Sequence, residues 1–522
     1  LELKPMTLRV FMTKNKPILK IILAVFLIGI FFLTRLQNLT AIPVFGDEAI
    51  YIRWSQIIKS VETLRFIPQT DGKQPLFMWV TAVIFKFISD PLVASRLVSI
   101  FSGFGIMLGI FLTTCIIISF SQKESNPLKF IFFSIKDNFY LAITSSSIYI
   151  FLPFSFFFDR LAVPDTMLSF FGIWSLFFSL LLAKFKRLDL SLILGIILGL
   201  SWLTKSPAVY FIVLAIFTYF VLNIKNIKTF FYPLISATIS FIIYNILRLG
   251  PQFQQIAARN KDYIWSLSEI LKHPFDPLKP HLLDTFSIYQ QYISWPILFF
   301  SLLSLILLIV KNKKHFKIDP KYLILISWWI LPLISNCIFA KVFTARYILF
   351  TLPPLVILIN FLLFNFFKKP VFKILFILLL LIPNFIFIKN LSLNPFNVTL
   401  LSTETGYTQG WTSGWGIKES ADYFKSRSLE ANVIVGTEGN FGTLPDGLQI
   451  YTNQVKQLTV IGLGLGFTKI PDNLINARDY GDEVYLLINK SRLKIDSSDQ
   501  AKMTLIKSFS KPNQDELLLY QL

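Results

Sequence analysis

Two adjacent carboxylates, Asp47 and Glu48, follow the first long apolar run of the chain. Acidic residues beside such runs are uncommon unless they are solvated, paired or functional. Pro43 and Gly46 precede them, which predicts a loop that enters a short helix. Consecutive helical residues point about 100° apart, so we expect two separate roles rather than a shared proton. The alternative is purely structural, with Asp47 capping the helix and Glu48 favouring its first turn.

Basic residues recur in other short stretches between apolar runs. Lys73 begins a short apolar segment, and Lys205 stands in the break between two long runs. Arg346 follows Lys341 across a tight turn and is itself followed by Tyr347, so both cations could face one anion. Lipid anchoring explains Lys73 equally well, and snorkelling explains Lys205. A charge so close to bilayer depth nevertheless predicts a functional site.

A third short polar stretch holds Arg160 and Asp165 on either side of Pro164. Asp165 is well placed to cap the helix that follows, so a structural or substrate-binding role is expected for this pair. His273 and His281 lie in a long loop, where packing explains them better than metal binding. We therefore predict no metal site, although the sequence leaves a divalent metal possible.

The composition predicts a multi-pass membrane protein. The chain has 522 residues, of which 54% are hydrophobic and only 15% charged, against about 25% charged in soluble domains. Mean hydropathy is +0.61. The net charge of +20 lies mostly in short loops, where the positive-inside rule explains it without nucleic acid. Cys115 and Cys337 lie in apolar runs and form neither a disulfide framework nor a CxxC motif.

Apolar runs near the roughly 20 residues that cross a bilayer give about eleven expected spans. They are 17–34, 96–120, 139–158, 165–183, 188–204, 207–223, 229–247, 287–310, 322–341, 345–366 and 370–390. A further run, 75–90, is short and contains Lys86. If all Lys-rich loops are cytoplasmic, this run lies in the interface instead of crossing. The alternative is that it crosses and that another span is misassigned.

The chain changes character after about residue 395, where glycines cluster and charges of both signs appear. We expect a transmembrane domain over 1–394, with outer loops 35–95 and 248–286, and a small α/β domain over 395–522. Expected strands are 433–436, 458–463, 484–488 and 517–520, with a helix near 417–429. Gly462, Gly464 and Gly466 form G-x-G-x-G, which indicates a turn more than a phosphate cradle.

This topology places the acids, the lone bases and the C-terminal domain on the outer side of a cell membrane. Acids can deprotonate a hydroxyl, and bases can stabilise a phosphate leaving group. Long apolar spans suit a lipid tail, and no nucleotide-binding loop is visible in the sequence. The pattern predicts group transfer from a lipid phosphate. The rival class is a transporter or flippase with a solute-binding outer domain, but we find neither paired broken spans nor inverted repeats in the sequence.

Several motifs resemble those of the GT-C superfamily in the order of that superfamily. Residues 34–49 resemble its first outer loop, within the bacterial branch of dolichyl-phosphate-mannose–protein mannosyltransferases and aminoarabinose transferases. The later motifs are matched by Lys73-Gln74-Pro75-Leu76, Arg160 with Asp165, Leu203-Thr204-Lys205 and Arg346-Tyr347 with Pro353. Residues 436–446 are similar to a segment of the outer domain in some bacterial members.

The resemblance implies an inverting transfer of a sugar from a polyprenyl-phosphate donor to an acceptor hydroxyl on protein, lipid or glycan. Asp47 matches the catalytic acidic position and Glu48 its neighbour. The groups expected near the donor phosphate are Lys73, Arg346, Tyr347 and Lys205. Aminoarabinose transferases carry Glu before the Lys of this motif, where this chain has Gly72. That departure weakens any transfer of a metal ligand, or of that particular sugar, to this chain.

Overall fold

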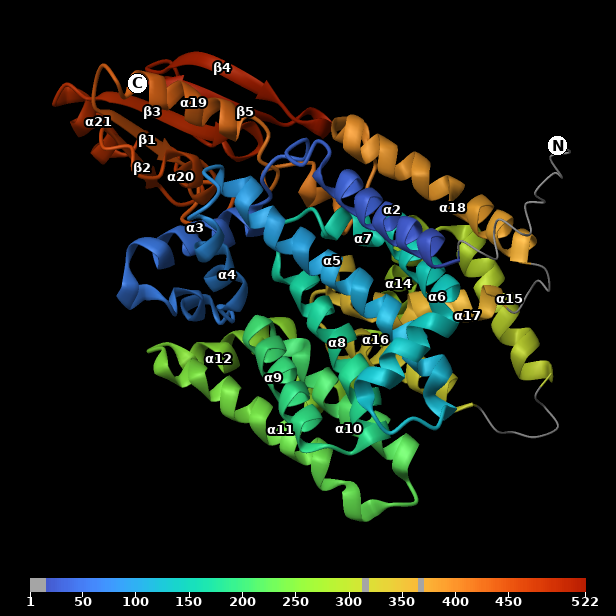
Figure 1. The fold of residues 1–522 in the computed structure, drawn as a ribbon. Coiled ribbons are helices and arrows are strands. Elements are labelled where there is room, and N and C mark those ends of the chain that lie inside the picture. The colour runs from blue at the N-terminus through green and yellow to red at the C-terminus, as the bar shows by residue number, and fades with distance from the viewer. Residues whose placement is uncertain (1–15, 312–318, 365–369) are drawn as a thin grey trace, which may run out of the picture.

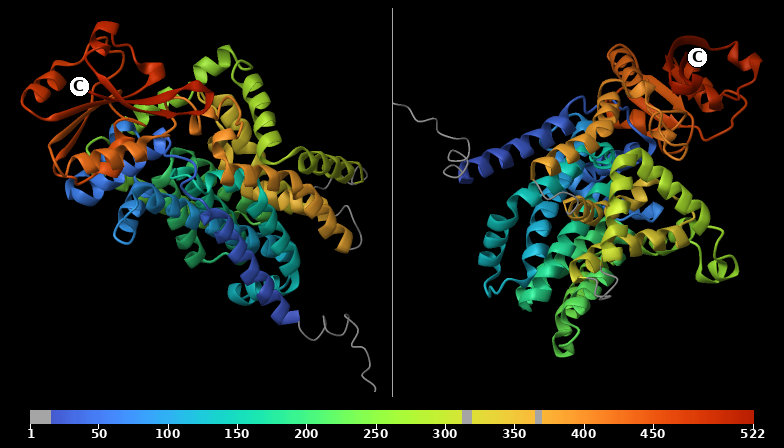
Figure 2. Two further views of the ribbon diagram at one scale, coloured as in Figure 1. Left: turned by 90° about the horizontal axis from the view of Figure 1, so that it is seen from above. Right: turned by 90° about the vertical axis from the view of Figure 1, so that its right-hand side faces the viewer.

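The structure, a computed structural model, describes residues 16–311, 319–364 and 370–522. A bundle of long helices carries a small sheet domain at one end (Figure 1). The sheet domain lies beyond the end of the bundle in the two further views as well (Figure 2). The architecture is therefore a helical membrane protein with a C-terminal sheet domain.

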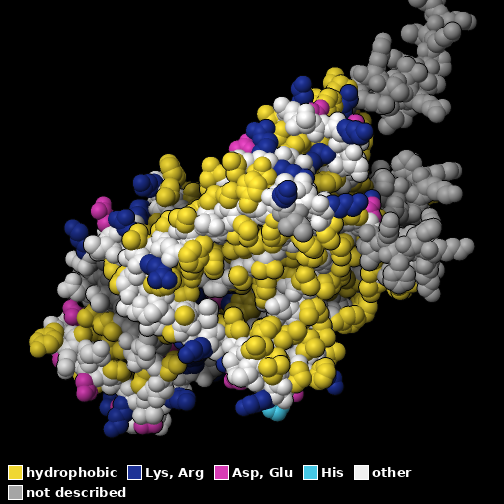
Figure 3. Space-filling view, turned by 90° about the horizontal axis from the view of Figure 1, so that it is seen from below, with side chains coloured by type: hydrophobic (Ala, Val, Ile, Leu, Met, Phe, Trp, Pro, Cys, Tyr) yellow, Lys and Arg dark blue, Asp and Glu magenta, His cyan; other side chains and the backbone are white. Residues whose placement is uncertain are grey.

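Eight helical segments of the described residues are long and apolar enough to cross a membrane. They fall on α2 (Lys16–Leu36), α5 (Pro91–Ile118), α8 (Pro164–Phe185), α10 (Val209–Asn223), α11 (Phe231–Tyr244), α16 (Pro320–Phe339), α17 (Leu352–Phe364) and α18 (Pro370–Leu393). Many of their apolar side chains are exposed, among them Phe26 at 63% and Val25 at 63%. Figure 3 shows such side chains over much of one face, with Lys and Arg mainly toward its margins. This surface suits lipid.

Two of the expected spans are interrupted, which corrects the sequence prediction. The run 139–158 divides at Leu152 between α6 (Pro127–Phe151) and α7 (Pro153–Phe158), because Pro153 disfavours helical backbone in the residue before it. The run 287–310 divides between α14 (Leu278–Tyr292) and α15 (Trp295–Lys311), where Ser294 has φ +80°.

One more expected span is short, since α9 (Leu188–Thr204) has 17 residues. The count of eleven spans therefore stays a prediction. The 75–90 run forms α4 (Leu76–Ile84), a helix of 9 residues. At 1.5 Å per residue α4 is about 14 Å long, too short for a hydrocarbon core of about 30 Å.

The helix starts follow ordinary capping chemistry. Asp90 precedes α5, and its Oδ1 accepts hydrogen bonds from the backbone N–H groups of Leu92 and Val93, both at 3.0 Å. Pro91 occupies the first helical position, where a missing N–H costs nothing. The same Asx-Pro signature starts α6 at Asn126. These caps fix where the chain turns at the ends of the bundle.

The sheet domain has five strands in the order β2-β1-β3-β5-β4. The strands are β1 (Val433–Thr437), β2 (Leu458–Gly462), β3 (Glu483–Asn489), β4 (Thr504–Ser510) and β5 (Glu516–Gln521). β1 pairs in parallel with β2 and β3, whereas β5 is antiparallel to β3 and β4. All four strands predicted from sequence are confirmed, as is α19 (Ile417–Arg427). β4 was not predicted, and it is an edge strand with mostly exposed residues.

The sheet domain packs along α3 (Gly46–Ser60), the helix that begins with the two carboxylates. Gln56 Nε2 donates to the carbonyl oxygen of Ile450 in α20 (Asp446–Thr452) at 2.8 Å. At the other end of α3, Gly46 N donates to the carbonyl oxygen of Thr412 at 3.1 Å. An antiparallel bridge also joins Phe45 to Ser413. The backbone just before Asp47 is thus held by residues 412–413.

Candidate functional site

Asp47 lies in the first turn of α3, and its carboxylate meets a guanidinium. Arg346 Nη1 lies 2.6 Å from Asp47 Oδ2. The Asp47 side chain keeps 32% of its surface exposed and Arg346 keeps 13%. This ion pair is therefore shielded on the arginine side and open on the carboxylate side, where a substrate can reach it.

Arg346 belongs to η7 (Ala345–Thr351), a 3-10 helix that precedes α17. Its guanidinium lies 5.9 Å from the ring centre of Phe45 and 5.2 Å from that of Tyr347. Arg346 Nε is buried and has no hydrogen-bond partner among the described residues. The guanidinium thus uses one edge for Asp47 and still has a donor to offer.

A second ion pair stands beside the first. Lys205 Nζ lies 2.6 Å from Asp165 Oδ1 and 4.5 Å from the ring centre of Tyr347. Lys205 follows the end of α9, and Asp165 lies in the first turn of α8, so each charge sits at a helix end. Tyr347 separates Lys205 from Arg346, and both cations contact its ring.

Lys73 approaches from the segment before α4. Its Nζ donates to the Tyr263 hydroxyl at 3.0 Å and lies 3.9 Å from Asp71 Oδ2. Asp71 is also bonded to Arg259 of α12 (Phe253–Tyr263), whose Nε donates at 3.0 Å. Because this one carboxylate is already shared by two cations, the turn does not suit a divalent metal.

The turn before Lys73 has a backbone conformation and a close neighbour that leave room only for a glycine, Gly72. Its φ is +68°, in the region that favours glycine. A Cβ here would lie 2.7 Å from the Cβ of Arg259 and 2.8 Å from the carbonyl oxygen of Gln255. The close approach of α12 therefore excludes a Glu at position 72 in this backbone.

The cations act together on Asp47. Burial raises the pKa of Asp47, but Arg346 lowers it by charge and by hydrogen bonding, and Lys73 and Lys205 lower it further. The net pKa of Asp47 is lower than the ordinary value of 3.8. Burial lowers the pKa of Lys73, but Tyr263 and Asp71 outweigh it and leave a raised value. Asp47 is thus an anion, and Lys73 a cation, at neutral pH.

Glu48 does not join this cluster, so its geometry favours a positioning role over the predicted catalytic one. Its side chain is fully buried and bonds Arg96, whose Nε and Nη2 donate at 2.9 and 2.7 Å. The backbone N–H groups of Phe45 and Ala162 also donate to Glu48, at 3.0 and 2.6 Å. With four donors satisfied, the carboxylate has no exposed surface for a substrate.

The contacts of Arg160 likewise favour the structural role over the substrate-binding one. Its Nη2 donates to the carbonyl oxygens of Gln37 and Asn38 at 2.9 and 2.6 Å, and its Nη1 to Ser392 Oγ at 3.2 Å. Only 2% of Arg160 is exposed. It therefore ties the end of α2 to α18, whereas Asp165, its partner in the sequence motif, faces Lys205.

Nothing in the sequence suggested Glu404 as a site residue, because an acidic residue is common in a polar segment such as this one. It is 1% exposed, and its Oε1 accepts a hydrogen bond from the backbone N–H of Ala345 at 2.8 Å. Its Oε2 is buried and, in the part of the chain that the structure describes, unpartnered. Burial raises the pKa of Glu404 to about 7, against the opposing effects of the Ala345 N–H and the Arg346 charge.

The two histidines of the long loop contact ordinary partners. His281 Nδ1 lies 3.0 Å from the carbonyl oxygen of Cys337, and His273 pairs with Asp276 at 3.5 Å on an exposed surface. Across residues 16–311, 319–364 and 370–522, no cluster of three or more His, Cys, Asp or Glu side chains could hold a metal ion.

No family model matches the chain, and a search of curated proteins found no match. Two solved structures resemble it over nearly the whole length. They are crystal structures of ArnT from Cupriavidus metallidurans, one bound to undecaprenyl phosphate and one in the apo state. Each has a TM-score of 0.53 and 11% identity, covering 96% and 97% of this chain and 97% and 98% of ArnT, respectively. The GT-C type of fold expected from the sequence is thereby confirmed.

Proposed function

We propose that this chain is a membrane glycosyltransferase that moves a sugar from a polyprenyl-phosphate donor to an acceptor hydroxyl. One observation carries the proposal. Asp47 lies against Arg346, and the charges of Lys73 and Lys205, from two other segments, also act on its carboxylate. An open carboxylate can accept the proton of the acceptor hydroxyl, and the cations beside it can stabilise a phosphate group that leaves the anomeric carbon of the sugar.

In this proposal Asp47 is the base. The acceptor oxygen bonds to the anomeric carbon while the bond from that carbon to the phosphate oxygen breaks, which inverts the configuration. The acceptor proton passes to Asp47, and the leaving polyprenyl phosphate takes the electron pair. Arg346 and Lys73 stabilise the charge that develops on this phosphate, and Tyr347 and Lys205 line the same space.

The Asp47–Arg346 pair is compatible with this role because a phosphate competes for the same guanidinium. Arg binds phosphate oxygens with two parallel donors. If the phosphate of the polyprenyl-phosphate sugar accepts hydrogen bonds from these N–H groups, Asp47 is left with a weaker partner, and its pKa rises. Donor binding would thus activate the base.

The nature of the donor is supported by the fold and by the surface. The ArnT structure of the same fold is described as bound to undecaprenyl phosphate. The helices of this chain present apolar side chains outward, which suits a polyprenyl tail. We place the site and the sheet domain on the extracytoplasmic side of the cell membrane. The acceptor is a protein, lipid or glycan hydroxyl.

The test uses purified full-length protein and a synthetic polyprenyl-phosphate sugar. Release of polyprenyl phosphate should depend on the protein, and Lys73→Ala should weaken donor binding about tenfold, as expected for a lost charged hydrogen bond. Lys86→Ala, a change in the turn after α4, is the matched control. Unchanged donor affinity in both Lys73→Ala and Arg346→Ala would exclude the phosphate site. Mass spectrometry of glycans in a deletion strain would identify the acceptor.

A further inference from the structure

A groove of about 510 Å³ lies between the helical bundle and the sheet domain. Its walls come from the C-terminal half of α3, the turn between α4 and α5, α19, and the end of α20. Pockets of this volume hold small molecules. Asp47 begins α3, whereas the groove lies at the other end of this 15-residue helix, which is about 22 Å long. The groove is therefore a site separate from the Asp47 cluster.

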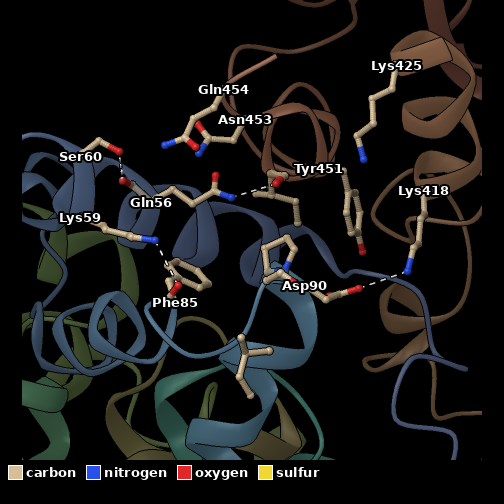
Figure 4. Close-up of a pocket in the computed structure, with 14 residues that line it drawn as sticks. Gln56, Lys59, Ser60, Phe85, Asp90, Lys418, Lys425, Tyr451, Asn453 and Gln454 are labelled. Carbon is tan, nitrogen blue, oxygen red and sulfur yellow. Dashed lines mark hydrogen bonds and ion pairs between the residues drawn. The ribbon is translucent and has the colours of Figure 1, made fainter. Parts of the chain in front are cut away.

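The groove has an excess of positive charge. Its lining residues include three lysines, Lys59, Lys418 and Lys425, and one carboxylate, Asp90. Figure 4 shows the two lysines of α19 on one side of Tyr451 and Lys59 of α3 on the other. Lys418 Nζ lies 3.2 Å from Asp90 Oδ2, so this cation is already neutralised. Lys425 Nζ lies 3.4 Å from Asp422 Oδ1 in an exposed pair on one helix, and such pairs are weak. Lys425 and Lys59 can therefore still attract an anion.

Hydrogen bonds within the protein hold the walls of the groove in place without a ligand. Lys59 Nζ donates to the carbonyl oxygen of Phe85 at 3.1 Å, and Gln56 Nε2 donates to that of Ile450 at 2.8 Å. Gln56 is only 8% exposed, and its Oε1 is buried without a partner within the described residues. A buried acceptor without a partner lowers the stability of the folded state. A hydrogen bond from a ligand hydroxyl to this oxygen would remove that cost.

Apolar side chains stand beside the same groove. Phe85 and Ile88 line it, and their neighbours Val83 and Phe87 are 52% and 78% exposed. Cations next to exposed apolar side chains are typical of surfaces at the membrane interface, where lysines attract anionic lipid. The turn between α4 and α5 thus offers a place for acyl chains next to a place for a charged headgroup.

We propose that this groove binds an anionic phospholipid whose headgroup carries hydroxyls, as a phosphoglycerol headgroup does. Lys59 and Lys425 bind the phosphate, a hydroxyl of the headgroup donates to Gln56 Oε1, and the acyl chains lie against Phe87. Because the walls come from both the bundle and the sheet domain, the bound lipid stabilises the contact between them. This proposal does not depend on the transfer reaction proposed above.

The experiment measures the Tm of full-length protein in a neutral detergent during titration with phosphatidylglycerol. Phosphatidylcholine and free glycerol 3-phosphate are titrated in parallel. Phosphatidylglycerol should raise the Tm by a few degrees, and the other two should not. In the double variant Lys59→Gln with Lys425→Gln, the half-saturating lipid concentration should rise at least fivefold. Lys456→Gln, an exposed lysine that does not line the groove, should behave as the wild type.

Equal half-saturation in the wild type and the double variant would overturn the site. A Tm rise with glycerol 3-phosphate as large as that with phosphatidylglycerol would overturn the lipid assignment in favour of a soluble anion. If the double variant does not fold, Lys425→Gln alone serves the same purpose, because this side chain is 39% exposed and its one ion pair within the described part of the chain lies on its own helix. A single variant with unchanged lipid response would also count against the proposal.

Discussion

Asp47 and Glu48 are neighbours in the sequence, yet their carboxylates lie in opposite surroundings. Glu48 is fully buried and receives hydrogen bonds from Arg96 and from two backbone N–H groups. Asp47 is one-third exposed and meets the single guanidinium of Arg346. A saturated carboxylate fixes the position of a helix, whereas a carboxylate with free oxygen surface is available for chemistry. The comparison predicts that the two residues fail in different ways when they are changed.

The largest effect is expected for Glu48→Ala. The change leaves the buried guanidinium of Arg96 without its counter-ion, which costs about 3–5 kcal/mol in comparable buried pairs. We expect little folded protein, or a strongly lowered Tm, in size-exclusion and thermal-unfolding measurements. Asp47→Ala is the matched control and should keep the wild-type yield. If Glu48→Ala were as stable as the control, the difference between the two carboxylates would not be structural.

Asp47→Asn should affect the opposite property. It keeps the shape of the side chain and removes the proton acceptor, so transfer should fall by about 10²-fold or more while the Tm stays close to that of the wild type. Turnover is measured as polyprenyl phosphate released per protein molecule. Near wild-type turnover in this variant would exclude Asp47 as the base.

Arg346→Lys should have a moderate effect, because a lysine keeps the charge but loses the planar pair of donors. We expect donor binding to weaken about tenfold, the scale of one charged hydrogen bond. Arg248→Lys, a change at an exposed residue in η6 (Asn245–Leu249), is the control. Equal donor affinity in the two variants would mean that Arg346 serves only to neutralise Asp47.

The smallest effect is expected for Glu404→Gln. Burial raises the pKa of Glu404 from 4.5 to about 7, so the folded state binds this proton more tightly than the unfolded state does. The associated stabilisation is complete below about pH 4.5 and is lost as the pH rises through about 7. A neutral glutamine removes this dependence, and the Tm difference between pH 5 and pH 8 should shrink by a few degrees. An unchanged pH profile of Tm would show that Glu404 does not titrate in this range.

The sequence could predict most of the charges that gather at the candidate site, but not how they pair. Lys73, Lys205 and Arg346 stand out because charges next to apolar runs are rare. Asp47 and Glu48 differ because Arg96 binds Glu48. Arg96 stands at the start of an apolar run, and the sequence does not indicate which carboxylate it pairs with. Glu404 becomes part of the site only because its segment folds back onto the N–H of Ala345.

The fold, too, could be predicted from the sequence only in part. Hydropathy finds apolar segments but does not show where one helix ends inside them, so the breaks at Leu152 and Ser294 were missed. The first break could have been predicted from Pro153, because proline disfavours helical backbone in the residue before it. β4 escaped prediction because an edge strand with exposed side chains lacks the apolar pattern of the inner strands.

The bridge between Phe45 and Ser413 bears on how such proteins can be recombined. The backbone just before Asp47 is completed by a segment that comes more than 300 residues later, through the bond from Gly46 N to the carbonyl oxygen of Thr412. Lys511 in turn donates to the carbonyl oxygen of Ser413 at 2.6 Å, so the end of the sheet holds the same strip. A chimera joined near residue 394 would divide this strip from its partner, and the graft would have to carry a compatible stretch around residue 45 as well.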